Sequence, residues 1–230
     1  MNFKILTTGF AIIYIFMLYI FMLYLTVKHK NFKKRKLPYN FYLSTFTNIF
    51  ISGMIFLFVL KYFNNKLNSK NNFPRLKNII FYFFIIDTLY YWYHRTIHRI
   101  PFLKKYVHLE HHQKEHLLPI DILHSTITES IMNLSLTNII PLFFLDINIS
   151  EYLFIILINF SHSLYIHYDC KKRFIPLFIT SKYHKFHHKF GKGNYSGFFT
   201  FWDDYMGTRI KRPKKDKKEK KDKTSSSFLN

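Results

Sequence analysis

Histidines occur in three closely spaced groups, and each group has the spacing of one helical face. The pattern HxxHH occurs twice, as His108-Leu-Glu-His111-His112 and as His184-Lys-Phe-His187-His188. A shorter pattern, HxxxH, joins His94 to His98. Residues i, i+3 and i+4 share one helical face, so each group is predicted to present its imidazoles along one stripe. Imidazole binds iron, zinc, copper and nickel, and these eight rings are too many for one ion and suit two.

The alternative interpretation places these histidines on solvated helical faces or at a membrane interface, as would be usual for a single histidine. Their repeated helical spacing beside apolar segments favours a dimetal site instead. Ligating imidazoles also need acceptors that fix their tautomers. Asp87 lies seven residues before His94, on nearly the same helical face, and is predicted to be such an acceptor. Alternatively, Asp87 faces other polar groups in the bundle, and Glu110 and Glu115 are interpreted as surface charges.

Long apolar segments must position the three histidine patterns, which we call the histidine boxes. Residues 5–27 and 37–60 contain no charged residue over 23 and 24 positions, and a bilayer core about 30 Å thick requires about 20 helical residues. Residues 78–93 form a third apolar run that only Asp87 interrupts. Residues 131–145 and 152–166, separated by two acidic residues, predict a helical hairpin. We therefore expect an all-α integral membrane bundle, with the histidine boxes on cytosolic helices that form a dimetal site.

The chain divides into three parts by composition. Residues 1–77 carry two N-terminal spans, residues 78–210 carry the boxes with a third span and the hairpin, and residues 211–230 form a basic tail that is predicted to be disordered. The first span could be a signal peptide, but it exceeds the usual length of about 7–15 apolar residues and no small-residue cleavage site follows it, which favours a retained anchor. The single cysteine, Cys170, excludes an intrachain disulfide framework and a Cys-rich metal site.

The net charge of +21 comes from 27 lysines and seven arginines, a bias typical of an AT-rich genome. Basic residues border the apolar spans and no nucleic-acid recognition motif occurs, so nucleic-acid binding is not indicated. Residues 28–36 contain six Lys or Arg in nine positions, whereas residues 61–77 contain five in seventeen. The denser loop is predicted to be cytosolic. The hairpin separates the boxes by an even number of crossings, so the boxes and the C-terminus are predicted to share that side, with a lumenal N-terminus.

These motifs resemble the fatty acid hydroxylase and sterol desaturase superfamily of membrane di-iron enzymes. The resemblance covers about residues 87–208, roughly half of the chain. Its most specific part is the ending, Asn194-Tyr-Ser-Gly197 followed by Trp202-Asp203-Asp-Tyr-Met-Gly207-Thr208. We assign this ending a structural role, in which Gly207 closes a turn and Trp202 packs beneath the last box.

The resemblance implies further metal ligands. Family members carry a histidine between the second box and the hairpin, followed by proline and an acid, whereas His124-Ser-Thr-Ile-Thr-Glu129 lacks the proline and displaces the acid. His162 matches better and His167 is a weaker candidate, while His116 could support a ligand and His29 is interpreted as unrelated. Ten histidines are therefore predicted to hold the metals, five for each ion: His94, His98, His108, His111, His112, His124, His162, His184, His187 and His188.

The resemblance also implies O2-dependent hydroxylation or desaturation of a membrane lipid at two iron ions, for which zinc could substitute in purified protein. The first box and the ending are more similar to sterol-modifying relatives, so a sterol is expected, and a fatty acyl or sphingolipid hydroxylase is the alternative. No nucleotide fingerprint or recognisable haem domain occurs, so we expect a cytochrome b5-type electron donor in the endoplasmic reticulum. A non-catalytic metal-handling membrane protein is the second alternative. The absence of a Gly-x-Ser-x-Gly elbow argues against a serine hydrolase.

Overall fold

A computed structural model describes residues 3–68, 73–112, 117–168 and 177–210, with side chains from residue 16 onward. Apart from one isolated antiparallel bridge between Phe178 and Phe199, the described part of the chain consists of helices and turns. The predicted all-α fold is therefore confirmed. Cys170, Glu115, His116 and the tail from residue 211 onward lie outside the described residues.

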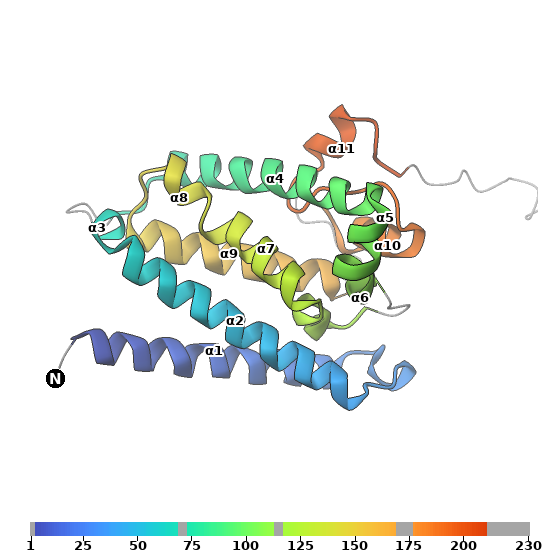
Figure 1. Cartoon of the computed structure of the whole chain (residues 1–230), viewed down its shortest axis with the longest axis horizontal. Coiled ribbons are helices and arrows are strands. Elements are labelled where there is room, and N and C mark those ends of the chain that lie inside the picture. Colours follow the sequence, from blue (N-terminus) through green and yellow to red (C-terminus); the bar gives the residue numbers. More distant parts are fainter. Residues whose placement is uncertain (1–2, 69–72, 113–116, 169–176, 211–230) are drawn as a thin grey trace, which may run out of the picture.

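The longer helices lie side by side along the long axis and alternate in direction (Figure 1). They are α1 (Phe3–Lys28), α2 (Tyr39–Tyr62), α4 (Leu76–Arg99), α7 (Ile127–Asn138) and α9 (Ile149–His167). At one end lie α3 (Asn64–Leu67) and α8 (Pro141–Phe144). The opposite end holds η1 (Phe32–Lys34), α5 (Pro101–Leu103), the π-helical turn η2 (Lys104–His108), α6 (Leu109–His112), η3 (Pro119–Leu123), α10 (Ser181–Phe190) and α11 (Phe201–Tyr205). All three histidine boxes therefore lie at one end of the bundle.

Three helical segments of the described chain are long and apolar enough to cross a membrane. They are Tyr39–Tyr62, Ile127–Phe144 and Ile149–His167, which correspond to the predicted second span and to both arms of the predicted hairpin. The part of α1 whose side chains are described, Phe16–Lys28, is apolar but shorter than these three segments. The third predicted span lies in α4, which is not among the three, because its 16-residue apolar run at 78–93 is shorter than the roughly 20 residues that a bilayer requires.

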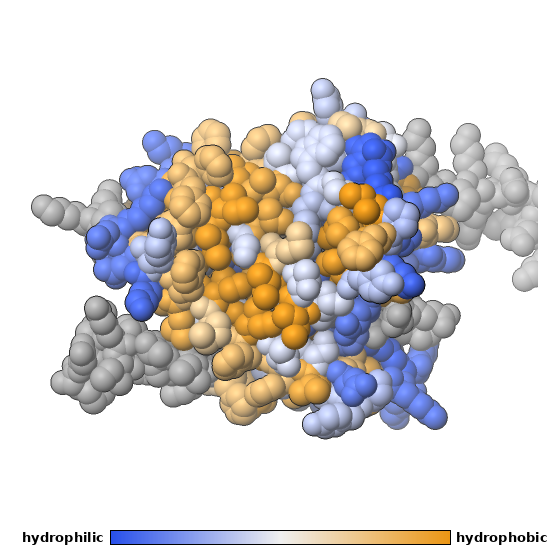
Figure 2. Space-filling model, in the orientation of Figure 1, coloured by the Kyte–Doolittle hydropathy of each residue, from blue (hydrophilic) through white to orange (hydrophobic). Residues whose placement is uncertain are grey.

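Large apolar side chains cover the outside of these helices. Only 17–22% of each span is buried inside the protein, and exposed residues include Phe46, Phe50 and Met54 of α2 and Phe154 and Leu157 of α9. Figure 2 shows this apolar surface as a central band with hydrophilic side chains at both ends. A soluble protein rarely exposes so large a contiguous apolar surface, so the band indicates contact with lipid.

Ion pairs that involve buried carboxylates stabilise both ends of the bundle. At the α3–α8 end, Arg75 Nε donates to Glu151 Oε1 at 2.8 Å, and Glu151 forms a capping box with Asn148 at the start of α9. At the histidine end, Arg35 donates to Asp121 of η3 at 2.6 Å. The two carboxylates are 0% and 1% exposed, so removing either arginine would leave an uncompensated buried charge.

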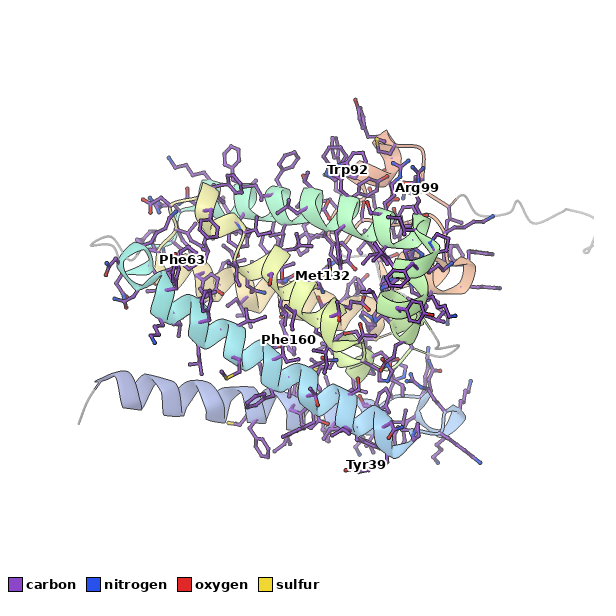
Figure 3. All side chains as sticks on the ribbon, viewed as in Figure 1. Tyr39, Phe63, Trp92, Arg99, Met132 and Phe160 are labelled. Carbon is purple, nitrogen blue, oxygen red and sulfur yellow. The ribbon has the colours of Figure 1, made fainter. Side chains whose placement is uncertain are left out.

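Side chains of the long helices fill the interior between these ends. Tyr82 of α4 and Tyr152 of α9 are fully buried there, and Trp92 of α4 lies beside α11 in Figure 3. The contact between α4 and α11 is aromatic, since the rings of Trp92 and Trp202 are 6.0 Å apart. Through this contact, the C-terminal segment is held against the helix that carries the first box.

Candidate metal centre

Nine described histidines form two groups at the boxes' end of the bundle. Within each group the ligand atoms, one ring nitrogen from each residue, all lie within 4.8 Å of one another. The first group comprises His94, His98, His108, His112 and His187, and the second comprises His111, His167, His184 and His188. These residues come from α4, η2, α6, α9 and α10, so neither group exists until distant helices pack together.

Each HxxHH box contributes to both groups, which the prediction of a single stripe did not anticipate. In the first box, His108 and His112 join the first group and His111 joins the second. In the last box this division is reversed, because His184 and His188 join the second group and His187 the first. Positions i+3 and i+4 lie about 100° apart around a helix axis, so neighbouring rings can serve two adjacent sites.

The tautomers of six rings are fixed by oxygen acceptors. Carbonyl oxygens accept from Nδ1 at 2.8–3.3 Å in five of these rings: His94 to Tyr195, His98 to Gly191, His111 to His124, His167 to Ser163 and His187 to Gly193. The sixth, His108, donates from Nδ1 to Glu129 Oε1 at 2.6 Å. A neutral imidazole with its proton on Nδ1 carries a lone pair on Nε2, so these rings present metal-ligating atoms.

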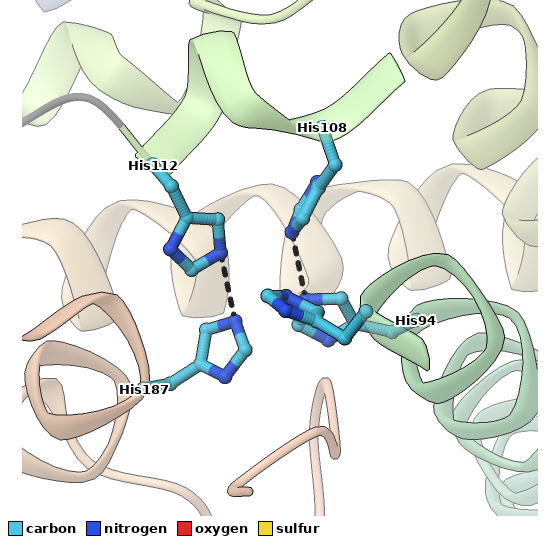
Figure 4. Close-up of side chains that lie close together, drawn as sticks. His94, His108, His112 and His187 are labelled. Carbon is cyan, nitrogen blue, oxygen red and sulfur yellow. Dashed lines mark hydrogen bonds between the residues drawn. The ribbon is translucent and has the colours of Figure 1, made fainter. Parts of the chain in front are cut away.

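The distances between Nε2 atoms of neighbouring rings show whether the groups fit metal ions. The Nε2 atoms of His94 and His108 are 3.1 Å apart, and those of His112 and His187 are 3.0 Å apart (Figure 4). In the first of these pairs both Nδ1 atoms already donate to oxygen, so two lone pairs face each other and no hydrogen bond joins them. Two imidazoles at right angles on an ion with bonds of about 2.1 Å would be about 3.0 Å apart. The donor set therefore fits a cation.

The second group has the same contacts. His184 Nε2 lies 3.0 Å from His188 Nε2 and 3.2 Å from His167 Nε2. Opposite ligands on one ion would be about 4.2 Å apart, close to the 4.8 Å limit within which each group lies. Small side-chain movements would bring either group onto an ion.

Burial keeps these imidazoles neutral. Desolvation, followed by the field of His94, lowers the pKa of His112 to about 3. Desolvation also lowers the pKa values of His184, His187 and His188 well below the usual range, and neighbouring imidazoles add to that effect. Only neutral imidazole binds a metal, so the rings can act as ligands at physiological pH.

Asp87, the predicted supporting residue, has different partners from those expected, and the direct carboxylate support comes from Glu129. Seven helical residues span about 10.5 Å, too far for a direct bond between Asp87 and His94. Asp87 Oδ1 instead accepts from the backbone N–H groups of residues 197–199 at 2.7–3.3 Å. It thus holds the segment beside Tyr195, whose carbonyl accepts from His94. Glu129, noted in the sequence only as a displaced acid, is the carboxylate that contacts a grouped histidine directly.

The Trp-Asp-x-x-x-Gly-Thr ending organises the segment that supplies the carbonyl acceptors. Asp203 is fully buried and accepts from the backbone N–H groups of Tyr195 and Ser196 and from the hydroxyls of Tyr183 and Thr208, at 2.6–2.9 Å. The prediction that Trp202 packs beneath the last box was wrong. Its ring lies against α4, and its Nε1 donates to the Thr88 hydroxyl at 3.0 Å.

The remaining described histidines, His29, His124 and His162, lie outside both groups. The His124 ring stacks on Phe41 at 4.5 Å, and its carbonyl accepts from His111. His162 lies against the Phe198 ring at 4.3 Å, whereas His167, the weaker candidate of the two, belongs to the second group. Five helical residues correspond to 500° of rotation, so His162 and His167 face in different directions. His29 also lies outside the groups and donates from Nε2 to the carbonyl of residue 168, beside His167.

A cavity of about 1460 Å³ opens onto the second group. It lies among α2, α4, α7 and α9, and His111, His167 and His184 contribute to its wall. Apolar side chains from α2 and α9, including Phe56 and Ile156, line much of the remainder. The volume exceeds the range of about 300–1,000 Å³ that is usual for small-molecule sites and would accommodate a lipid.

Comparison with protein families matches residues 79–208 to the family described as fatty acid hydroxylase. The chain belongs to this family. The matched region begins in α4 and ends at Thr208, so it includes all nine grouped histidines, the cavity wall formed by α7 and α9, and the Asp203 segment. No solved structure matches the chain.

Named relatives of the chain modify sterols. A methylsterol monooxygenase of Aspergillus fumigatus is 32% identical over 150 residues, which cover 59% of this chain and 49% of the relative. The Arabidopsis thaliana protein named "Putative Delta(7)-sterol-C5(6)-desaturase 2" is 30% identical over 131 residues, covering 56% and 46%. A C-4 methylsterol oxidase of Schizosaccharomyces pombe is 28% identical over 155 residues, covering 62% and 51%. The chain thus spans about half the length of these relatives.

Proposed function

We propose that this chain is a membrane-bound oxidoreductase that uses two iron ions and O2 to hydroxylate or desaturate a lipid, with a sterol as the expected substrate. The observation that carries the proposal is the junction of the second histidine group with a large cavity, since His111, His167 and His184 belong both to that group and to the cavity wall. The family assignment and the sterol-modifying relatives support the same conclusion.

The nine grouped histidines would hold the two ions, five on one and four on the other. When bound, iron would supply the capacity to reduce O2 and abstract hydrogen from an unactivated C–H bond. The protein's own contribution is geometric and electrostatic. Glu129 and the carbonyl acceptors hold six of the nine grouped rings in one tautomer. The apolar cavity would orient one carbon toward the second group and limit access of water.

Ten predicted ligands and nine grouped histidines differ at three positions. We propose His167 in place of His162, because the described His167 ring lies in the second group and the His162 ring lies against Phe198. We also propose that His124 supports His111 through its carbonyl. The ligand roles of the other eight histidines remain as proposed from the sequence.

Two alternatives make different demands on the site. A fatty acyl or sphingolipid hydroxylase would use the same metal groups with a different occupant of the cavity. A metal carrier would require ligands near the bilayer midplane, whereas the groups lie at the end of the bundle with the basic loop. The sterol-modifying relatives favour the sterol oxidoreductase.

The test of this proposal is oxidation of endogenous sterols in microsomes that contain the chain, a reductant and isotopically labelled O2. We expect label in a hydroxylated sterol, or a new double bond with labelled water as co-product. The variants His111→Ala and His187→Ala each remove one ring from a different group and should abolish turnover. His29→Ala is unsuitable as a control because His29 contacts the residue next to His167. Tyr39→Ala is better, since Tyr39 is 78% exposed and lies outside both groups and the cavity wall. Turnover by both histidine variants at the wild-type rate would refute the proposal.

We further propose an endoplasmic reticulum location, with the histidine end cytosolic and supplied with electrons by a cytochrome b5-type donor. Support comes from the basic loop at residues 28–36, which lies at the same end of the bundle as the boxes. Glycosylation acceptors could be inserted at Lys33, at Lys70 and at Lys220, of which the latter two lie outside the described residues. Modification of the Lys70 insertion alone is expected, and modification at Lys33 or Lys220 would overturn this orientation.

A further inference from the structure

The two histidine groups differ in their access to the cavity. The second group contributes His111, His167 and His184 to the cavity wall, whereas none of the five described residues of the first group belongs to it. The groups also differ in size, with five rings in the first and four in the second. We propose that only the second group holds its ion open to a ligand from the cavity, while the first group encloses its ion. This inference deepens the function proposed above and rests on it.

Burial closes the first group. His94 and His108 are each 2% exposed, and His187 is fully buried. The Nδ1 atom of His98 donates to a carbonyl, so its ligand atom is Nε2, which is shielded from water and has no hydrogen-bond partner among the described residues. Five imidazoles supply one ligand more than the four that close a structural zinc site, so an ion held among them needs no ligand from outside.

Tyr90 of α4 and Glu129 of α7 separate the first group from the cavity. Both side chains belong to the cavity wall. The ring of Tyr90 lies 5.1 Å from that of His94, and Glu129 Oε1 accepts from His108 Nδ1 at 2.6 Å. The rings of His94 and His108 therefore lie behind the residues that line the cavity, and a lipid in the cavity meets Tyr90 and Glu129 before it could reach them.

His111 gives the second group an open side. Its Nδ1 donates to the carbonyl of His124, so its lone pair lies on Nε2. Unlike His98 Nε2, this atom is not shielded from water, and no described residue forms a hydrogen bond with it. Catalytic metal sites keep a position open for a water or a substrate, and non-haem iron sites of oxygenases do the same. A lipid in the cavity would therefore meet the second ion alone.

A lipid with a metal-ligating end tests this inference by binding, without turnover. The purified full-length chain would be loaded with cobalt(II), which suits imidazole sites and whose visible spectrum reports a new ligand, and titrated with 1-dodecylimidazole. The control probe, 1-dodecylpyrrole, has the same chain and ring size but no nitrogen lone pair for a metal. Relative to the metal-free chain, we expect cobalt to raise the affinity for the imidazole probe at least tenfold over that for the pyrrole probe. One molecule should bind per chain.

Variants that keep one group intact show which ion the probe reaches. His98→Ala removes a ring from the first group, and His188→Ala removes one from the second. When each variant retains one cobalt ion, His98→Ala should keep both the tenfold preference and the spectral change, whereas His188→Ala should lose both. The opposite pattern would overturn the inference, as would a spectral change in both variants.

Asn159→Trp supplies a test that leaves both groups intact. Asn159 lines the cavity and lies eight residues, or about 12 Å, before His167 on α9, within reach of a dodecyl chain. Tryptophan there should lower the affinity for 1-dodecylimidazole several-fold while two ions remain bound. Phe154→Trp is the matched control, because Phe154 of α9 is 47% exposed and lies outside the cavity wall. Equal affinity in wild type and Asn159→Trp, with two ions in each, would contradict access through the cavity.

Failure of this inference and failure of the proposed function give different results. Two bound ions without any gain of the imidazole probe over the pyrrole probe would refute the unequal groups and leave the oxidoreductase proposal standing. A clear imidazole preference in a chain that binds two ions but incorporates no labelled oxygen would retain the unequal groups and refute the oxidoreductase proposal.

Discussion

Replacement of Glu129 by glutamine should weaken metal binding. The carboxylate accepts from His108 Nδ1 at 2.6 Å, and the two side chains are only 2% and 10% exposed. Loss of such an outer partner costs about 10–100-fold in metal affinity, or about 1.4–2.7 kcal/mol. Glutamine keeps an acceptor for the His108 N–H, so we expect the lower half of the range.

Chelator titration of metal-loaded protein, followed by metal analysis, would measure this effect. Asp146→Asn is a suitable control because this carboxylate is exposed, lies at the α3–α8 end of the bundle and belongs to neither group. Wild type and Asp146→Asn should lose metal at the same chelator concentration, and Glu129→Gln at a concentration about tenfold lower. Identical titrations for all three proteins would refute the assignment of Glu129 as a support of a metal ligand.

Further predictions follow from the ligand set and its supports. His167→Ala should reduce metal content by about one ion per chain, whereas His162→Ala should leave it unchanged; the reverse result would favour His162 as the ligand. Gly193→Ala should lower both stability and metal content, because its φ is +69° and a Cβ would lie 2.5 Å from a backbone oxygen. Gly207 has a similar φ of +66°, but a Cβ there would meet no atom within 4 Å, so Gly207→Ala should lower the free energy of unfolding by only about 1–2 kcal/mol, as measured by thermal unfolding. In chelated protein, the pKa of His112 is lowered to about 3, so this imidazole stays neutral in the folded state and takes up a proton only on unfolding. The free energy of unfolding should therefore fall as pH decreases below about 6.5, by about 1.4 kcal/mol per pH unit for each such ring. An unfolding free energy that stays constant from pH 7 to 5 would contradict this.

The sequence predicts the elements of the site better than their arrangement. Helical spacing within the boxes identifies eight of the nine grouped histidines, because local periodicity determines which rings can converge. It does not determine which face of α9 meets α10. The family resemblance favours His162, whereas the structure brings His167 beside His184 and leaves His162 against Phe198. That choice depends on helix packing, which is a long-range property.

The acceptors were the least predictable part of the site. Most are backbone carbonyls, including those of Gly191, Gly193 and Tyr195, and no side-chain pattern identifies a carbonyl acceptor. The glycine-rich segment after the last box was a partial signal, since Gly191 and Gly193 both adopt positive φ. The apolar spans were predictable from composition, whereas the cavity among them depends on how side chains from several helices leave space.

Metal analysis of the purified, folded chain tests the central claim most directly. Two groups of ring nitrogens, each within 4.8 Å, predict close to two transition-metal ions per chain. Zinc in place of iron would be consistent with the claim, since imidazole sites accept both. Removing a ring from either group, by His98→Ala in the first or His188→Ala in the second, should lower the count toward one. A count near zero in folded wild-type protein would contradict the dimetal centre.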